Sequence, residues 1–216
     1  MMLKALILAT TMSLSVLPAQ AAFTDFSDLT AGDNFFGPIG GPNNTITSSA
    51  IAFTIINAAD ATEDGRITVE NGTFARDPVS GNHLFFQNRV GVAVDLLPGT
   101  ESLSFSFNSN YGNVTLAVND ESLFAGSDLV KLDGTTIGDA LVSIDLFGSS
   151  GPFTQFGTLM LEGDINDFSI TGTEFAFDNF RAESNDSATP SVPEPGTAGI
   201  PLMAMGGLML LYRRLV

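Results

Sequence analysis

The sequence predicts an all-β fold, an antiparallel β-sandwich of jelly-roll-like type, and three observations lead to this prediction. Short apolar runs with a repeat of two recur through the middle of the chain, as in SLSFSFNS, where Leu103, Phe105 and Phe107 alternate with serines. Turn-forming pairs such as Asn71-Gly72 separate these runs. No long segment with a helical repeat lies between them. Half-polar strands joined by tight turns are typical of antiparallel sandwiches, and the lack of helical crossovers excludes an α/β fold.

The expected strands follow one another through the whole middle of the chain. In order they are AFTII (52–56), RITV (66–69), HLFF (83–86), VGVAVDL (90–96), SLSFSFNS (102–109), NVTLAV (113–118), ALVSIDLFG (140–148), TLML (158–161), DFSI (167–170) and EFAF (174–177). The expected turns are Asp64-Gly65, Asn71-Gly72, Pro98-Gly99, Asp133-Gly134, residues 148–151 and Thr171-Gly172-Thr173. The predicted aromatic core consists of Phe53, Phe74, Phe86, Phe105, Phe107, Phe175 and Phe177.

Length and composition limit the classes of function that this chain can have. The 216 residues suffice for one domain with a real core, here expected over residues 22–183. There is no cysteine, which excludes disulfides and thiolate chemistry. With 24 acidic and 8 basic residues the formal net charge is −16. Such a chain repels phosphate backbones, so no nucleic acid is expected among its partners.

The first 21 residues have the organisation of a secretory signal peptide. Lys4 gives the positive start, residues 5–17 are apolar, and Ala19-Gln20-Ala21 forms the small-x-small cleavage site. An uncleaved transmembrane anchor is the alternative, but the apolar run is short for that role. We therefore expect export and cleavage after Ala21 by signal peptidase.

The other end of the chain carries a second set of signals. A polar linker (184–191) precedes Val192-Pro193-Glu194-Pro195, an uncharged segment (196–212) and the pair Arg213-Arg214. The segment is barely long enough to span a bilayer as a transmembrane helix, and the arginines stop transfer and stay on the cytoplasmic side. The two prolines fix an extended backbone around Glu194, so that an enzyme can read it.

This arrangement resembles the PEP-CTERM sorting signal. The resemblance implies recognition by exosortase, a membrane enzyme of Gram-negative bacteria that make exopolysaccharide. It also implies that the protein rests only transiently in the inner membrane, loses its hydrophobic tail, and reaches the cell surface or the extracellular matrix. The alternative is an ordinary single-span anchor that leaves a periplasmic domain attached to the membrane.

Both ends of the expected domain look similar to jelly-roll carbohydrate-binding modules, through FTDFSDLTAGDNF (23–35) and FAFDNFRAE (175–183). In such modules the first and last strands are neighbours, and their acidic residues can hold a structural Ca²⁺. Carried over by position, the resemblance implies Asp178 as a ligand with Asp25 or Asp28 as its partner; carboxylate oxygens suit Ca²⁺. The alternative is structural: Asp178-Asn179 starts a bend, and Asp28 caps a turn.

The residues give little support for an enzyme. His83 is the only histidine and is best explained as the entry to a strand after the turn at 80–82, with no nucleophile elbow in the chain. DATEDG (60–65) shares part of a calcium-loop spacing but fits a surface turn better. Acidic pairs of a glycosidase are too common in such a composition to be informative. The chain has no tryptophan, and Tyr111 is the only tyrosine outside the tail, which weakens the case for sugar stacking.

The sequence therefore predicts a non-enzymatic cell-surface or matrix protein that associates with exopolysaccharide. A Ca²⁺-dependent glycan-binding module is the alternative.

Overall fold

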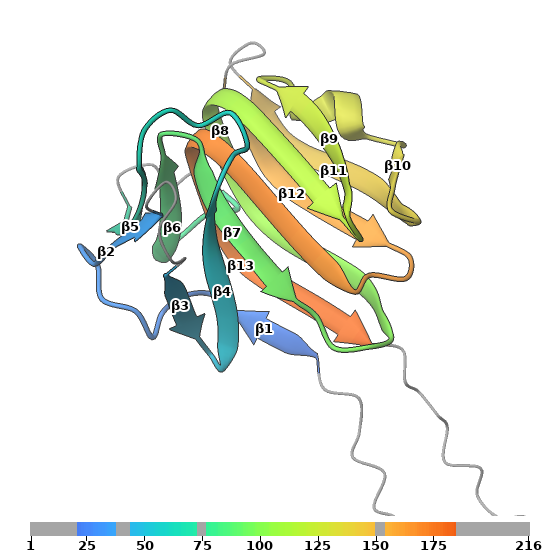
Figure 1. The fold of residues 1–216 in the computed structure, drawn as a ribbon, viewed down its shortest axis with the longest axis horizontal. Helices are drawn as coiled ribbons and strands as arrows, with labels where there is room; N and C mark the ends of the chain where they lie inside the picture. The colour runs from blue at the N-terminus through green and yellow to red at the C-terminus, as the bar shows by residue number, and fades with distance from the viewer. Residues whose placement is uncertain (1–20, 38–43, 73–76, 150–153, 185–216) are drawn as a thin grey trace, which may run out of the picture. The chain divides into compact units, whose positions relative to one another are not determined.

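The fold is that of a computed structural model, which describes residues 21–37, 44–72, 77–149 and 154–184 (Figure 1). These residues form an all-β, sandwich-like structure of antiparallel strands, as predicted. The strands are β1 (Ala22–Thr24), β2 (Asn34–Gly37), β3 (Thr45–Ser48), β4 (Ile51–Asn57), β5 (Gly65–Asn71), β6 (Asn82–Gln87), β7 (Val90–Asp95), β8 (Thr100–Val118), β9 (Glu121–Gly126), β10 (Thr136–Ile137), β11 (Ala140–Ser149), β12 (Gln155–Glu162) and β13 (Asp167–Ser184). A short 3₁₀ turn, η1 (Leu129–Leu132), follows β9. None of the described segments is a helix long and apolar enough to cross a membrane.

Two long strands, β8 and β13, pair with each other over nearly their whole length and belong to both layers of the sandwich. In layer 1, the halves 112–118 of β8 and 167–173 of β13 are flanked by β9 on one side and by β7, β4 and β3 on the other. In layer 2, the halves 100–109 and 175–184 are flanked by β12, β11 and β10, and by β1, β6, β5 and β2.

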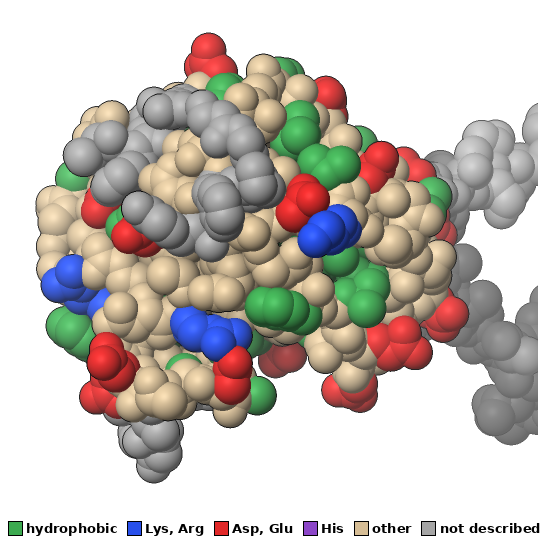
Figure 2. Space-filling view, turned by 90° about the horizontal axis from the view of Figure 1, so that it is seen from above, with side chains coloured by type: hydrophobic (Ala, Val, Ile, Leu, Met, Phe, Trp, Pro, Cys, Tyr) green, Lys and Arg blue, Asp and Glu red, His purple; other side chains and the backbone are tan. Residues whose placement is uncertain are grey.

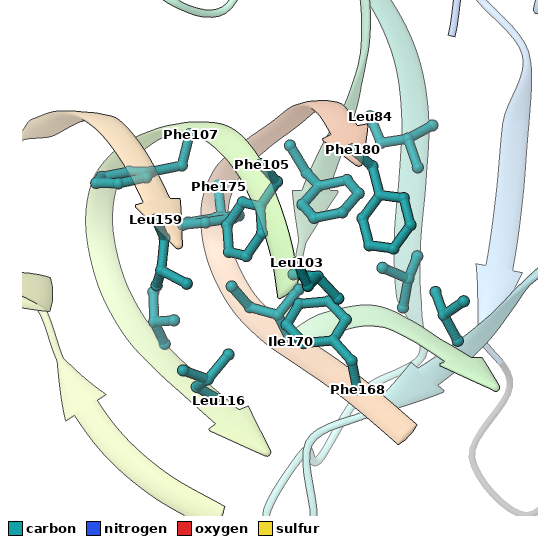
Figure 3. Close-up of a cluster of buried hydrophobic side chains, with 14 of the residues drawn as sticks. Leu84, Leu103, Phe105, Phe107, Leu116, Leu159, Phe168, Ile170, Phe175 and Phe180 are labelled. Atoms are coloured by element: carbon teal, nitrogen blue, oxygen red, sulfur yellow. The ribbon is translucent and has the colours of Figure 1, made fainter. Parts of the chain in front are cut away.

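The ring contacts show how sharply this ribbon bends. Phe168 and Phe180 lie on the same strand, β13, yet their ring centroids are 6.2 Å apart. A straight strand would separate them by about 40 Å at about 3.3 Å per residue. The two halves of β13 therefore face each other across the core, and Figure 3 shows Phe105, Phe168 and Phe180 on the concave side of the curved β13.

The bend runs across three neighbouring strand paths. In β8 it falls at Gly112 and Asn113, with φ values of 82° and 52°. In β13 the register shifts between Thr171 and Phe175. Between β6 and β7 it falls at Asn88-Arg89, because Phe86 and Val90 pair with successive parts of β13. Such corners, at which strands pass from one sheet to the other through bulges, are typical of folded sheets.

The bend corrects two details of the sequence prediction. The expected turn at 171–173 lies inside the continuous strand β13, and the runs 102–109 and 113–118 are halves of one strand, β8. A glycine that the sequence does not single out, Gly112 of β8, permits close packing at the bend. A Cβ at Gly112 would lie 2.1 Å from Cα of Ser127, so no other residue fits without displacement of the backbone.

The core is rich in phenylalanine, as expected. The fully buried phenylalanines are Phe26, Phe53, Phe86, Phe105, Phe107, Phe168, Phe175, Phe177 and Phe180. All predicted members are confirmed except Phe74, which lies outside the described residues. Phe26, Phe168 and Phe180 were not predicted. The alternation of buried and exposed residues along β13 is interrupted near Phe180. Asn179 has a φ of 50° and the register shifts between Asp178 and Arg181, which turns the Phe180 side chain inward.

Candidate functional site

The first and last described strands are neighbours, as the resemblance to jelly-roll modules implies. β1 pairs with β13 through Ala22 opposite Ala182 and Thr24 opposite Phe180. This pairing brings Asp25, just after β1, close enough to Asp178 for its negative charge to contribute to a rise in the pKa of Asp178. Asp25 also acts in this way on Asp28, so it interacts electrostatically with both of the other candidate ligands.

Asp178 lies on the outer face of layer 2, because its neighbour in the strand, Phe177, points into the core. The side chain of Asp178 is nevertheless completely buried. Its Oδ2 accepts the backbone N–H of Ser80 at 3.0 Å, and its Oδ1 accepts that of Asn179 at 2.7 Å. Asn179 Nδ2 donates to the carbonyl of Pro78 at 3.2 Å. Burial raises the pKa of Asp178 to about 6, although the two N–H bonds favour the charged form. This carboxylate fastens residues 78–80 against the sheet.

Asp28 joins β1 to the β3–β4 hairpin. Its Oδ1 accepts the Ser48 hydroxyl and its Oδ2 accepts the Ser49 N–H at 2.8 Å. Ser48 Oγ in turn lies 2.6 Å from Thr24 Oγ1. These bonds hold the pKa of Asp28 below its ordinary value, and bonds from Ser27 do the same for Asp25. Asp25 caps a local turn through the Ser27 N–H, whereas Asp28 binds the turn between β3 and β4 and not a turn next to it in the chain.

The three carboxylates do not converge on one point. Among the described residues, no group of three or more His, Cys, Asp or Glu side chains lies close enough together to hold a metal ion. The oxygens of Asp28 and Asp178 already accept hydrogen bonds from the protein. Their present arrangement therefore does not fit a Ca²⁺ site, and Ca²⁺ binding stays a prediction from the resemblance.

His83 is the second residue of β6, as predicted for a strand entry, and it is fully buried. Its Nδ1 lies 3.2 Å from the carbonyl oxygen of Gly81. Burial lowers the pKa of the imidazole, so the ring is neutral at physiological pH. It faces Glu70 across the β5–β6 pair, and burial raises the pKa of that carboxyl. The predicted surface loop after β4 contains Asp60, which forms an ion pair with Arg89.

The outer face of layer 1 holds a hollow of about 440 Å³ that the sequence did not predict. We call it the trough. Its floor includes Thr115, Ser122, Ser169 and Thr171, four hydroxyl-bearing residues of β8, β9 and β13. Its walls are Phe124 of β9 on one side and Ile56, residues 57–60 and Arg89 on the other. Figure 1 shows the strands of this layer side by side, from β9 through β8, β13 and β7 to β4.

Phe124 was not predicted as a site residue, because the sequence prediction for phenylalanine concerned only the members of the core. Its neighbours along the chain offered a signal, since in ESLFAG no alternation of apolar and polar residues marks a buried face. In the structure four of the six residues of β9 are exposed, and the Phe124 side chain is 61% exposed.

A second, larger hollow of about 700 Å³ lies where β13 ends and is lined by Glu101, Glu162, Asp164 and Glu183. Figure 2 shows acidic side chains distributed over the visible face, with only a few basic ones among them. This surface disfavours polyanionic partners.

The sorting residues Ala19, Val192, Pro193, Glu194, Pro195, Arg213 and Arg214 lie outside the described residues, as does the segment 196–212. Ala21 is exposed and immediately precedes β1, so cleavage after it would leave every described strand intact. No protein-family model, curated protein or solved structure matches this chain.

Proposed function

We propose that the protein is an exported, non-enzymatic component of the cell surface or extracellular matrix that associates with exopolysaccharide. The strongest support is that the β-sandwich domain contains all the described strands, while the two predicted signals lie outside it at the ends of the chain. Every described strand and every core side chain lies between Ala22 and Ser184. Cleavage at both ends would remove the signal peptide and the sorting signal and leave the β-sandwich intact.

The proposed route follows from the sorting signal. Signal peptidase removes residues 1–21, and the segment 196–212 pauses in the inner membrane with Arg213 and Arg214 on the cytoplasmic side. Exosortase then acts near Glu194 and releases the domain. The neighbouring positions of β1 and β13 support the jelly-roll-like type of sandwich that the resemblance implies.

Outside the cell, the proposed role of the domain is passive retention. Its acidic surface keeps it soluble and apart from anionic polymers, while neutral glycans meet no such repulsion. We propose no catalytic role for His83, whose buried, neutral ring lies beneath the outer surface of layer 2.

Intact-mass measurement on protein from the medium, the outer membrane and the inner membrane tests the route. A surface or medium species that lacks residues 1–21 and the residues beyond the Pro-Glu-Pro region is expected. A full-length C-terminus confined to the inner membrane would overturn the proposal and favour the single-span periplasmic anchor. Release of reducing sugar from purified exopolysaccharide would overturn the non-enzymatic assignment.

The alternative, a Ca²⁺-dependent glycan-binding module, is favoured by one observation, the electrostatic interaction of Asp25 with Asp178. Glycan retention that disappears in EDTA and returns with Ca²⁺ would support it over the Ca²⁺-independent association proposed above.

A further inference from the structure

We propose that the trough on the outer face of layer 1 binds a neutral sugar unit of a polysaccharide, with Phe124 as the stacking platform. The inference rests on the proposed association with exopolysaccharide for the source of the glycan. It adds the site, the side chains and the charge class of the ligand.

The shape of the trough comes from small residues between two walls. One row across the sheet reads Phe124, Thr115, Thr171, Gly91 and Ile56. The middle of this row carries only short side chains, while its ends carry large apolar ones. A Cβ at Gly91 would lie 1.7 Å from the carbonyl oxygen of Ile170, so β7 and β13 can approach this closely only with a glycine at this position of the row. The volume, about 440 Å³, is within the range of about 300 to 1,000 Å³ typical of small-ligand sites.

The exposed wall supplies an aromatic face. Phe124 is 61% exposed, whereas the nine phenylalanines of the core are fully buried. The face of an aromatic ring is electron-rich and attracts the weakly positive C–H groups that a sugar ring presents on its own face. The floor is too rich in hydroxyl groups for a lipid chain, which would leave those groups without hydrogen bonds.

Two polar groups at the trough lack a partner within the described part of the chain. The Thr171 side chain lines the floor and is 5% exposed, and its Oγ1 has no hydrogen-bond partner. Arg89 Nε likewise has none, although its guanidinium pairs with Asp60. Buried polar groups without partners are costly, so a ligand that supplies both an acceptor and a donor gains from satisfying them. Sugar hydroxyls do both.

The charge at the trough selects a neutral ligand. Among the described residues that line it, Arg89 and Asp60 alone are charged, and they neutralise each other. An anionic sugar would be attracted by the guanidinium but repelled by Asp60 and by the acidic surface around it. A neutral sugar meets a donor in Arg89 and an acceptor in Asp60 without that repulsion.

Affinity electrophoresis of the full chain through gels that contain dextran, mannan, soluble cellulose derivatives or purified exopolysaccharide tests the site. A polyoxyethylene detergent should be used, because sugar-headed detergents would compete for the trough. Retardation by at least one neutral polysaccharide is expected, and Phe124→Ala and Thr171→Val should each weaken it at least tenfold. The matched controls are Phe147→Ala, another exposed phenylalanine, and Thr158→Val on layer 2, which should change it less than twofold.

The outcomes separate this inference from the proposed function. Retardation that neither Phe124→Ala nor Thr171→Val weakens would overturn the trough as the site and leave the glycan association standing. Retardation only by anionic polysaccharides would overturn the charge class of the ligand. Retardation by none of these polymers would overturn both the site and the association with exopolysaccharide, while the intact-mass result would still decide the sorting route.

Discussion

Two buried polar side chains, Asp178 on the outer face of layer 2 and Thr171 on the outer face of layer 1, differ in how their polar atoms are satisfied. On layer 2, Asp178 is fully buried and accepts two backbone N–H groups, of which that of Ser80 fastens a loop over the sheet. On layer 1, Thr171 is also buried, but its hydroxyl has no partner within the described residues and the surface above it is open as the trough. Asp178 thus holds a loop in place, whereas the Thr171 hydroxyl is left for the ligand proposed above.

The largest expected effect concerns the glycines of the two faces. Gly91→Ala should destabilise the protein by about 4 kcal/mol or more, because the new Cβ collides with the Ile170 carbonyl and forces β7 away from β13. Gly81→Ala, in the loop on layer 2, should cost only about 1 kcal/mol, since its φ is 67° but nothing lies within 4 Å of the added atom. Urea unfolding measures both changes. Equal costs would show that the β7–β13 pair tolerates a side chain at Gly91.

The next effect is a pH dependence carried by Asp178. Its folded pKa of about 6 exceeds the ordinary value of 3.8, so its contribution to stability is fully present below pH 3.8 and is lost as the pH rises through about 6. Asp178→Asn keeps an acceptor but cannot ionise. Relative to this variant, the wild type should lose about 2 kcal/mol of unfolding free energy between about pH 4 and about pH 8. A pH-independent difference would mean that Asp178 is not buried as described.

A pair of buried threonines gives the most direct comparison of the faces. Thr24→Val should destabilise by about 1 to 2 kcal/mol, because Thr24 Oγ1 bonds to Ser48 and accepts the Phe26 N–H at 3.0 Å. Thr171→Val should leave stability unchanged or raise it by up to about 1 kcal/mol, since it removes a hydroxyl without a partner. Thermal or urea unfolding tests both. A clear loss in Thr171→Val would reveal a structural role for that hydroxyl and count against the trough as a ligand site.

The cap at Asp28 should contribute less. Asp28→Ala removes the acceptor for Ser48 and Ser49 and is expected to cost about 1 kcal/mol near neutral pH. Because the folded pKa of Asp28 is lowered, this contribution is present above its ordinary pKa and disappears as the pH falls through the lowered value. Wild type and variant should therefore converge in acid, which unfolding at a series of pH values would show.

The smallest expected effect is that of calcium. The candidate carboxylates do not gather into a group within the described residues. The Tm in about 1 mM Ca²⁺ should therefore exceed the Tm in EDTA by less than about 2 °C. A larger rise that Asp25→Asn abolishes would show that Asp25 and its neighbours rearrange around the ion. That result would favour the Ca²⁺-dependent glycan module.

Much of the fold could be predicted because a strand's alternation is local. Leu103, Phe105 and Phe107 were expected on one face and are all buried, as are Val90, Val92 and Val94. The bend could not be predicted, because Gly172 looks the same in a hairpin turn and in a strand that passes from one layer to the other. Less of the candidate site could be predicted from the sequence. The proximity of Asp25 to Asp178 followed from the resemblance, but the trough depends on residues from β4, β8, β9 and β13 that are far apart in the chain.

The amino-acid sequence was sufficient for the strand pattern and the acidic character, and it predicts the two end signals, because each of these depends on residues close together in the chain. The tertiary structure alone decided which faces are covered. Whether a threonine finds a partner, or a phenylalanine an enclosing core, depends on strands brought together by the folded β8–β13 ribbon. Thr24 and Thr171 are the same residue type and are both buried, but only Thr24 meets a hydroxyl from another strand, so one supports the fold and the other is left for a ligand.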